Sequence, residues 1–283
     1  MQTSLMPMTP LPTTKYTTDD PIGQGIQWLT DPENWQGSNG VPVRLLEHLG
    51  YSALTIGLAL LIAVPIGLYV GHTGRGKVII VSLAGMLRAL PTLGLVILFA
   101  LLTSPLALMP PIWALVLLAI PPILTGVYAG ISSVEPDIVD AARSMGMSEV
   151  QVLFRVEVPN GLKVMLGGFR GCVLQVIATV AVVAYLPQGG LGRFIISGLK
   201  SYDYGSVFGG AVLVALLAIV VDGLLALVTR FVVPTGLQTR VLKGSQQNHH
   251  DENHHHDAED RSESGRIARN VENNVAVSKG GTL

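Results

Sequence analysis

The chain has 283 residues, of which 49% are hydrophobic and 13% are charged, whereas an ordinary soluble domain has about 25% charged residues. Eighteen cationic and nineteen anionic side chains leave a formal net charge of −1, which excludes the cationic excess of a nucleic-acid-binding protein. A single cysteine, Cys172, excludes an internal disulfide framework and a multi-cysteine zinc site. This composition indicates an all-α, polytopic membrane protein.

The N-terminal segment, residues 1–50, is polar to mixed in character. It lacks the positively charged start, the short apolar stretch and the cleavage site of a secretory signal. Trp28 and Trp35 stand on either side of the Asp31-Pro32 break, and tryptophan is common at membrane–water interfaces. We therefore expect an extracytoplasmic segment that contains a short interfacial helix.

Five long apolar stretches follow, each close to the roughly 20 residues that a helix needs to cross a bilayer of ~30 Å. They are 52–71, 83–106, 111–130, 164–186 and 207–233. Pro65, Pro91 and the pair Pro121-Pro122 lie inside them, and proline removes a helix hydrogen bond. We therefore predict a transmembrane domain over residues 51–236 with about five core helices, some of them kinked or broken.

Small residues also mark these stretches. Glycines stand four residues apart in the pairs Gly67/Gly71, Gly126/Gly130 and Gly205/Gly209. This spacing allows close helix contact, although a chain with 32 glycines contains such pairs by chance as well. We expect Cys172 to be one small core residue among many.

Cationic residues are concentrated on one side of the predicted membrane. The linkers after the first, third and fifth stretches carry Arg75, Lys77, Arg143, Arg155, Lys163, Arg240 and Lys243. Because the cation-rich side of a membrane protein is the cytoplasmic one, the N-terminus is predicted outside and the C-terminal tail inside the cell.

The longest polar insertion between the stretches, residues 131–163, is patterned as two short helices. Pro136, which follows Glu135, predicts a helix start, because proline is favoured in the first turn. Ala141 and Ala142 continue this helix with small side chains that leave a closely approachable face, and a glycine at 146 predicts its end.

The second short helix of this insertion carries an apolar stripe. Ser148 and Gln151 have the spacing of a capping box, and Pro159 is expected to close the helix. Val150, Leu153 and Phe154 stand at i, i+3 and i+4 and form one apolar face. An apolar face in water needs a partner, and a soluble protein with a groove is the natural candidate.

The tail, residues 237–283, is predicted to be disordered, because it contains few apolar residues. It carries five clustered histidines, His249, His250, His254, His255 and His256. Neutral imidazoles bind zinc or nickel, but we interpret these residues as part of a solvated cytoplasmic tail and predict no metal site.

Asp222 lies deep in the last stretch, where a charge costs about 2.5–3.5 kcal/mol on insertion scales. It is expected either to make a structural hydrogen bond or to contact the transported substrate. Asp222 is therefore one candidate for a substrate contact. Tyr185 is the other, because the face of an aromatic ring attracts cationic groups. No other titratable group of the stretches is expected to pair with Asp222, which argues against a membrane-embedded enzyme.

The polar insertion resembles the EAA loop of ABC-importer permeases. That loop reads Glu-Ala-Ala, three residues, Gly, nine residues, Ile, any residue, Leu, Pro. The residues Asp140-Ala141-Ala142, Gly146 and Val156-Glu157-Val158-Pro159 have the same spacing. Asp140, Val156 and Val158 are conservative departures from the pattern. The resemblance implies that this loop is a coupling helix that docks on a cytoplasmic ATPase subunit.

The resemblance covers about residues 27–236. The segments 46–52, 72–76, 88–94, 189–195 and 202–204 resemble the branch that imports glycine betaine, proline, choline or carnitine. It implies a MetI-like type I importer permease fold in the bacterial cytoplasmic membrane, and a transporter subunit rather than an enzyme.

Several partners are implied by the same resemblance. They are two cytoplasmic ATPase subunits, a second permease subunit that is identical or homologous, an extracytoplasmic solute-binding protein and the lipid bilayer. ATP and magnesium belong to the ATPase, and no cofactor is expected in this chain. The segment 71–77 almost spells a phosphate-binding loop, but Val78 replaces its magnesium-binding Ser or Thr.

The expected ATPase contact consists of the residues that match the motif or form the apolar stripe. They are Asp140, Ala141, Ala142, Gly146, Val150, Leu153, Phe154, Val156, Val158 and Pro159. The expected cargo is a glycine betaine-type quaternary ammonium solute. Proline, choline, carnitine and ergothioneine are alternative cargoes, and a secondary transporter or channel without an ATPase is the alternative function.

Overall fold

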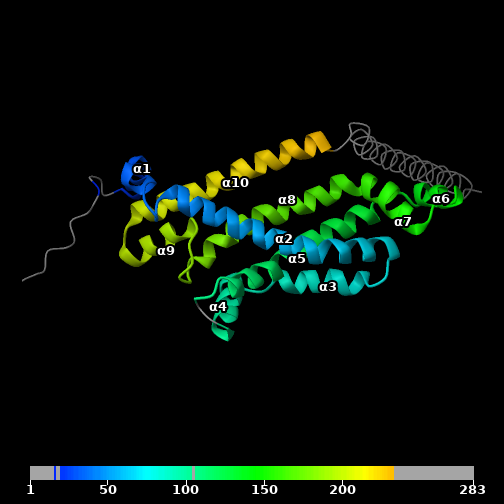
Figure 1. Ribbon diagram of the computed structural model, residues 1–283, viewed down its shortest axis with the longest axis horizontal. Helices are drawn as coiled ribbons and strands as arrows, with labels where there is room; N and C mark the ends of the chain where they lie inside the picture. Colours follow the sequence, from blue (N-terminus) through cyan, green and yellow to red (C-terminus); the bar gives the residue numbers. More distant parts are fainter. Residues whose placement is uncertain (1–15, 17–19, 104–105, 233–283) are drawn as a thin grey trace, which may run out of the picture. The chain divides into compact units, whose positions relative to one another are not determined.

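The computed structural model describes residues 16, 20–103 and 106–232, and every regular element in this part of the chain is a helix (Figure 1). The predicted all-α class is thereby confirmed. In chain order the α-helices are α1 (Pro21–Thr30), α2 (Val41–Thr73), α3 (Lys77–Arg88), α4 (Thr92–Leu102), α5 (Met109–Ser132), α6 (Pro136–Ser144), α7 (Glu149–Val152), α8 (Val158–Val183), α9 (Gly192–Ser201) and α10 (Tyr204–Val232). A 3-10 helix, Pro32–Trp35, follows α1, and a π-helical turn, Leu153–Glu157, joins α7 to α8.

Four helices of the described residues are long and apolar enough to cross a membrane. They are α2, α5, the continuous helix Glu149–Val183 and α10, and the bent pair α3–α4 makes a fifth span if it is counted as one. The prediction of about five core spans is thus confirmed.

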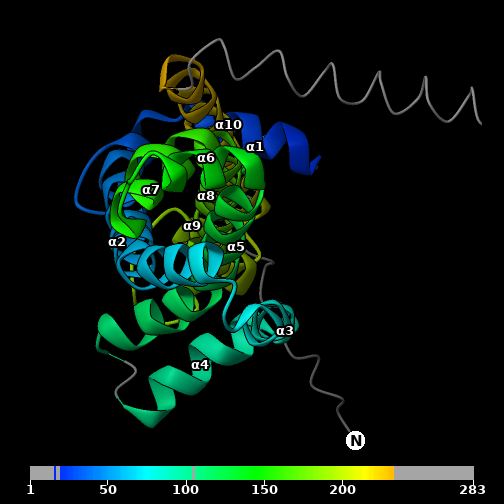
Figure 2. The ribbon, with the colours of Figure 1, turned by 90° about the vertical axis from the view of Figure 1, so that its right-hand side faces the viewer.

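One predicted span is not a single helix. The stretch 83–106 is divided between α3 and α4, which meet at an angle of 90°. Figure 2 shows the two helices running in different directions. Pro91 stands at the break, directly before the first residue of α4. Its ring has no N–H and disfavours a helical residue in front of it, so α3 ends there. By contrast, α2 and α5 continue through Pro65 and through Pro121-Pro122.

The N-terminal segment contains the predicted short helix. Asp20 caps α1 by accepting a hydrogen bond from the backbone N–H of Gly23 at 2.9 Å. Trp28 is buried, and its ring meets that of Phe194 in α9 edge to face, with 4.9 Å between centroids. The helix α2 begins at Val41 and runs through the expected domain boundary at residue 50.

The centre of the bundle is α5, which packs against α2 and α8. A Cβ added at Gly67 of α2 would lie 2.9 Å from Val127 of α5. A Cβ added at Gly126 of α5 would lie 2.7 Å from the Cα of Gly168 in α8. The close contacts expected from the spaced glycines are therefore present, and Cys172 is fully buried in the same core.

The last span, α10, has its buried residues at its first turns, where Gly205, Ser206, Gly209 and Gly210 lie. A Cβ added at Gly209 would collide with the ring of Trp28. Farther along, α10 exposes large apolar side chains such as Leu216, Ile219 and Leu224. The helix belongs to the first compact unit of the chain up to Thr229, and a second unit begins at Arg230. The predicted tail, residues 237–283, lies outside the described residues, and so do its five histidines.

Candidate functional site: a braced loop between two membrane helices

The loop between α5 and α8 folds as its local sequence predicts. Pro136 opens α6, and Gly146 follows the end of this helix with φ at +82°, a left-handed conformation that favours glycine. Ser148 caps α7, because its side chain accepts from the backbone N–H of Gln151 while the Gln151 side chain accepts from the N–H of Ser148. The two predicted short helices and the capping box are confirmed.

The expected end of the second helix at Pro159 is wrong. From Glu149 the chain continues as one helix to Val183, and Pro159 lies in the first turn of α8. In a straight α-helix the ring of Pro159 would clash with the carbonyl of residue 155. The turn Leu153–Glu157 is π-helical, and its wider hydrogen-bond spacing accommodates the ring. The second half of the loop is therefore continuous with the membrane helix α8.

The apolar stripe lies largely on the outside of the loop. Val150 and Phe154 are exposed, Leu153 is half-buried, and Val152 on the opposite face is fully buried. Ala142 of α6 is buried as well. The loop therefore has a small core of its own and presents its larger apolar side chains outward.

The remaining residues of the motif lie at the surface or near it. Asp140, Ala141 and Pro159 are exposed, and Val156 and Val158 are half-buried. Of the two alanines, only Ala142 packs inside the loop, while Ala141 is open to a partner.

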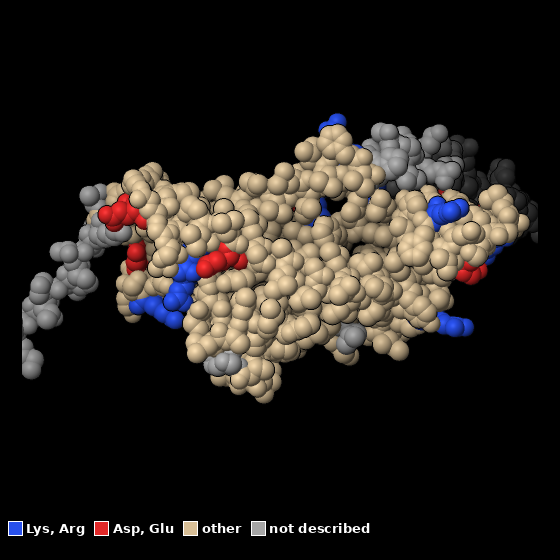
Figure 3. Space-filling model, in the orientation of Figure 1, with Lys and Arg blue, Asp and Glu red and all other residues tan. Residues whose placement is uncertain are grey.

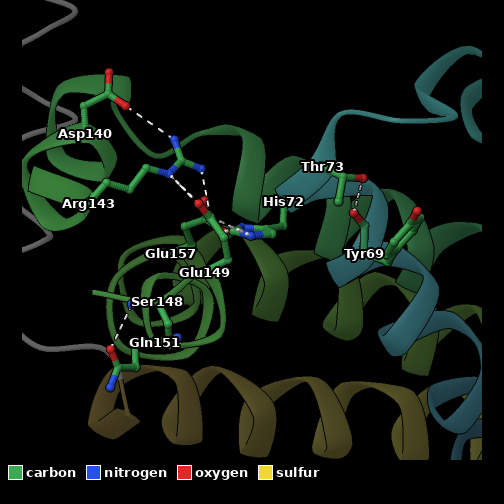
Figure 4. A network of polar contacts seen from close by, with 9 residues as sticks. All are labelled: Tyr69, His72, Thr73, Asp140, Arg143, Ser148, Glu149, Gln151 and Glu157. Atoms are coloured by element: carbon green, nitrogen blue, oxygen red, sulfur yellow. Dashed lines mark hydrogen bonds and ion pairs between the residues drawn. The ribbon is translucent and has the colours of Figure 1, made fainter. Parts of the chain in front are cut away.

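Charged side chains tie α6 to α7. Figure 4 shows the guanidinium of Arg143 between two carboxylates. Its Nε and Nη2 atoms each lie 3.1 Å from a carboxylate oxygen of Glu149, and its Nη1 lies 3.4 Å from Oδ1 of Asp140. This hydrogen bonding raises the pKa of the Arg143 guanidinium and lowers the pKa of the Glu149 carboxyl, so both groups stay charged at neutral pH.

The same network reaches the end of α2 through His72. Its Nδ1 lies 2.6 Å from Oε2 of Glu157, and its Nε2 lies 3.2 Å from Oε2 of Glu149 (Figure 4). Carboxylate oxygens accept hydrogen bonds, and each of the two ring nitrogens of His72 faces one of them. His72 thus bridges one carboxylate of α7 and one of the π-helical turn.

The exposed fraction of the side chains decreases along this network. The side chains of Asp140 and Glu149 are 71% and 60% exposed, that of Arg143 is 42% exposed, and those of His72 and Glu157 are 13% and 6% exposed. The network therefore leads from the open surface of the loop to a buried contact with a membrane helix. The loop surface is thus connected to both α2 and α8.

Sequence reasoning missed three residues of this network, His72, Glu149 and Glu157, which we call the clamp. Glu157 occupies the unspecified position of the motif, and His72 lies at the end of another helix, 85 positions away. The sequence contains no local signal that these side chains meet, because the contact depends on how α2 packs beside α8.

The two candidates for a substrate contact lie elsewhere. Asp222 is paired with Arg170 of α8, with 2.5 Å from Oδ1 to Nε and 2.7 Å from Oδ2 to Nη2. The expectation that Asp222 has no titratable partner in the spans is therefore wrong. Tyr185 is half exposed beyond the end of α8, and Nζ of Lys200 lies 5.8 Å from the centroid of its ring.

Comparison with known proteins places this geometry in one family. The model of the family described as "Binding-protein-dependent transport system inner membrane component" matches residues 63–233, which include the loop and both helices that it joins. The glycine betaine/carnitine/choline transport system permease protein OpuCB of Bacillus subtilis is 31% identical over 192 residues, which are 68% of this chain and 88% of the relative. The osmoprotectant import permease protein OsmW of Salmonella typhimurium is 32% identical, over 68% of this chain and 91% of the relative.

Solved structures show a similar fold. An inward-facing MetNI methionine ABC transporter matches with a TM-score of 0.62 and 18% identity, over 72% of this chain and 100% of that chain. An amino acid ABC transporter crystallised with histidines matches with a TM-score of 0.51 and 20% identity, over 66% of this chain and 90% of that chain. These similarities confirm the expected MetI-like arrangement of helices.

Proposed function

This chain belongs to the family of binding-protein-dependent transport system inner membrane components, and from that premise we propose that it imports glycine betaine-type quaternary ammonium solutes, driven by separate ATPase subunits. It is a membrane-spanning permease subunit of a transport system and not itself an enzyme. The cargo proposal is supported by the names of its relatives, which include permeases for glycine betaine, choline and carnitine.

The proposed ATPase contact is the apolar face of the loop. Val150 and Phe154 point outward from a loop that has its own core and is braced by charged side chains. Exposed apolar side chains on a rigid helix fit a groove in a partner protein. Two ATPase subunits, one for each permease of a dimer, would each receive one such loop. ATP and magnesium would be bound by those subunits.

We propose that His72 transmits the motion of the loop. Because Glu157 holds one ring nitrogen and Glu149 the other, the ends of α2 and α8 follow the loop together. When ATP binding draws the two ATPase subunits together, the loops approach each other and the helices attached to them tilt. Such rocking of helix bundles opens a central path alternately to the two sides of the membrane.

In this proposal the loop end of the chain is cytoplasmic and the N-terminus lies outside. The loop carries Arg143 and Arg155, and the turn after α2 carries Arg75 and Lys77, which agrees with the cation-rich side being cytoplasmic. The end of the helix bundle at which α1 and α9 lie would then face the extracytoplasmic binding protein.

A second permease subunit would complete the path. Large apolar side chains of α10 are left uncovered by the other described helices of the chain. In the membrane, either lipid or a second subunit covers them. This subunit is either identical to this chain or homologous to it, and purification of the complex distinguishes the two cases.

The observation that carries the proposal is the exposed Val150–Phe154 face on a loop clamped to α2 and α8, inside the region matched by the family model. The test is uptake of labelled glycine betaine, carnitine, choline, proline and ergothioneine, at low and high external salt, by cells with and without the gene. We expect betaine uptake to disappear on deletion and to return with the wild-type gene. Loss of another solute alone would replace the cargo, and ATP-independent uptake would favour a secondary transporter.

A further inference from the structure

A polar hollow lies at the end of the helix bundle opposite the loop between α5 and α8, which we call the coupling loop. Its volume is about 360 Å³, and its lining residues lie at or just before the start of α2, in α9 and in the first turn of α10. These elements lie at the end of the helix bundle away from α6 and α7 (Figure 1). The side chains that give it its polar character are Asn39, Arg44, Arg193, Ser197, Ser201 and Ser206. Small-molecule sites have volumes of about 300–1,000 Å³, so the hollow is large enough for a solute of a few heavy atoms.

One of its two arginines is held in place. Nη1 of Arg44 lies 2.8 Å from Oε2 of Glu47, and Nη2 lies 2.6 Å from Oδ1 of Asn39. The same Glu47 oxygen accepts a hydrogen bond from the backbone N–H of Gly190 at 2.8 Å, in the segment just before α9. Arg44 is therefore fixed between α2 and the segment that leads into α9.

The second arginine has no such partner. Arg193 stands in the first turn of α9 and is half-buried, and its guanidinium makes no hydrogen bond or ion pair with another described residue. Cationic and acidic side chains lie next to one another at this end of the molecule (Figure 3). Two guanidinium groups thus line one hollow. Two carboxylates lie near it and are already hydrogen-bonded: Glu47 bonds Arg44, and Asp203 accepts from the backbone N–H of Ser206. An anionic group with two oxygens, such as a carboxylate, is the ligand that matches two guanidinium groups.

We propose that Arg193, together with Arg44, binds the carboxylate of a zwitterionic solute as it enters the permease from the extracytoplasmic side. This inference rests on the proposed function. Glycine betaine and carnitine carry a carboxylate as well as a trimethylammonium group, whereas choline has the same ammonium group and a hydroxyl in place of the carboxylate. The hollow would therefore distinguish cargoes within one chemical class, at a site separate from the binding protein.

The first test compares these solutes in one transporter. ATP-driven uptake of labelled glycine betaine, carnitine and choline is measured for the wild type, Arg193→Gln and Arg193→Lys. We expect Arg193→Gln to lower betaine and carnitine uptake about tenfold relative to choline, since a hydrogen bond to a charged group is lost. Arg193→Lys keeps the charge but not the two-pronged geometry, so its effect is expected to be smaller.

The matched control is Lys200→Gln. Lys200 is an exposed cation on the same helix, but it does not line the hollow. This variant loses the same charge and is expected to leave the betaine-to-choline ratio unchanged. If Arg193→Gln lowers the uptake of all three solutes equally, the arginine serves the binding protein rather than the cargo, and the proposal is overturned. An unchanged ratio and rate would overturn it as well.

A second measurement does not depend on transport. Saturation-transfer NMR detects weak binding of glycine betaine, with choline as the matched probe, to the full-length permease in lipid nanodiscs. We expect a betaine signal that is strongly reduced by Arg193→Gln and not by Lys200→Gln. If the wild type carries none of the three solutes, the cargo assignment is wrong, and if it carries only one, the assignment becomes narrower. In both cases the NMR measurement still tests whether Arg193 belongs to a betaine-binding site. A betaine signal that does not depend on Arg193 contradicts the proposal in either case.

Discussion

Nδ1 of His72 lies 2.6 Å from Oε2 of Glu157, although 85 positions separate the two residues in the sequence. Glu157 is almost completely buried, and the other ring nitrogen of His72 faces Glu149. Because a buried carboxylate is costly without a partner, this contact favours one arrangement of α2 beside the coupling loop. The loop is fastened at two places, through the continuous backbone into α8 and through His72 to α2.

We expect His72→Gln to weaken the coupling between ATP hydrolysis and uptake. Glutamine has nearly the reach of histidine, but its two N–H donors share one nitrogen and cannot meet two carboxylates on opposite sides, as the two ring nitrogens of His72 do. In proteoliposomes that contain the complete transporter and its binding protein, the number of solute molecules carried per ATP hydrolysed is expected to fall several-fold.

Thr73→Ala is the matched control for this variant. Thr73 is the neighbouring residue at the same helix end, and its hydroxyl donates to the carbonyl of Tyr69 in its own helix at 2.7 Å. The ratio of solute to ATP is expected to stay at the wild-type value. A His72→Gln transporter with an unchanged ratio would show that the clamp has no part in coupling.

Gly146→Leu is expected to uncouple transport without preventing membrane insertion. A Cβ at this position meets no atom within 4 Å, so the cost comes from the backbone, whose φ is +82°. A left-handed conformation costs an ordinary residue about 1–2 kcal/mol, and Asn tolerates it better. Uptake should therefore decrease in the order wild type, Gly146→Asn, Gly146→Leu at equal membrane content. Equal uptake in all three would disprove this role of the turn.

Gly168→Ala is expected to destabilise the contact between α5 and α8. The added Cβ would lie 2.5 Å from the Cα of Gly126, and backbone atoms cannot move aside as a flexible side chain can. Overpacking of this kind costs about 1–3 kcal/mol. Gly167→Ala provides the control, because a Cβ there meets nothing within 4 Å. The thermal unfolding midpoint in detergent should fall for Gly168→Ala only, and equal midpoints would contradict the close packing.

Asp222→Asn is expected to destabilise the permease, because it leaves Arg170 of α8 without its carboxylate. Replacing both residues by leucine removes the unpaired charge and should restore the unfolding midpoint and much of the uptake. A double variant that is as stable as the wild type but carries no solute would instead assign Asp222 or Arg170 to the substrate path.

Arg143→Gln is expected to raise the pKa of the Glu149 carboxyl, since hydrogen bonding to Arg143 is the main cause of its lowered pKa. A lowered pKa in the folded state stabilises the loop above the unfolded pKa of Glu, and this stabilisation is lost as the pH falls through the lower value. The Arg143–Glu149 pair is therefore charged at neutral pH. The carboxyl ¹³C shift of Glu149, followed against pH, measures the change, and an unaltered titration midpoint in Arg143→Gln would contradict the assignment.

The parts of the fold that depend on local sequence could be predicted. Pro136 and the Ser148–Gln151 capping box act within one turn, and they define the two short helices from the sequence alone. The expectation for Pro159 was wrong because the π-helical turn before it changes the local geometry, and no simple residue pattern indicates such a turn.

Contacts between distant helices could not be predicted. The pairs His72–Glu157 and Arg170–Asp222 join residues of different helices, and each depends on the rotation and depth of both partners. A lone charge in an apolar stretch indicates that a partner is needed, but it does not indicate which residue supplies it.

The most direct test of the account is photo-crosslinking from the apolar face of the loop in cells. A photoreactive phenylalanine analogue replaces Phe154, which is 56% exposed, and in the control it replaces Leu199 of α9, which is 52% exposed and lies at the opposite end of the chain. We predict a crosslinked product with the ATPase subunit from position 154 and none from position 199. A product from position 199, or none from position 154 in an actively transporting cell, would contradict it.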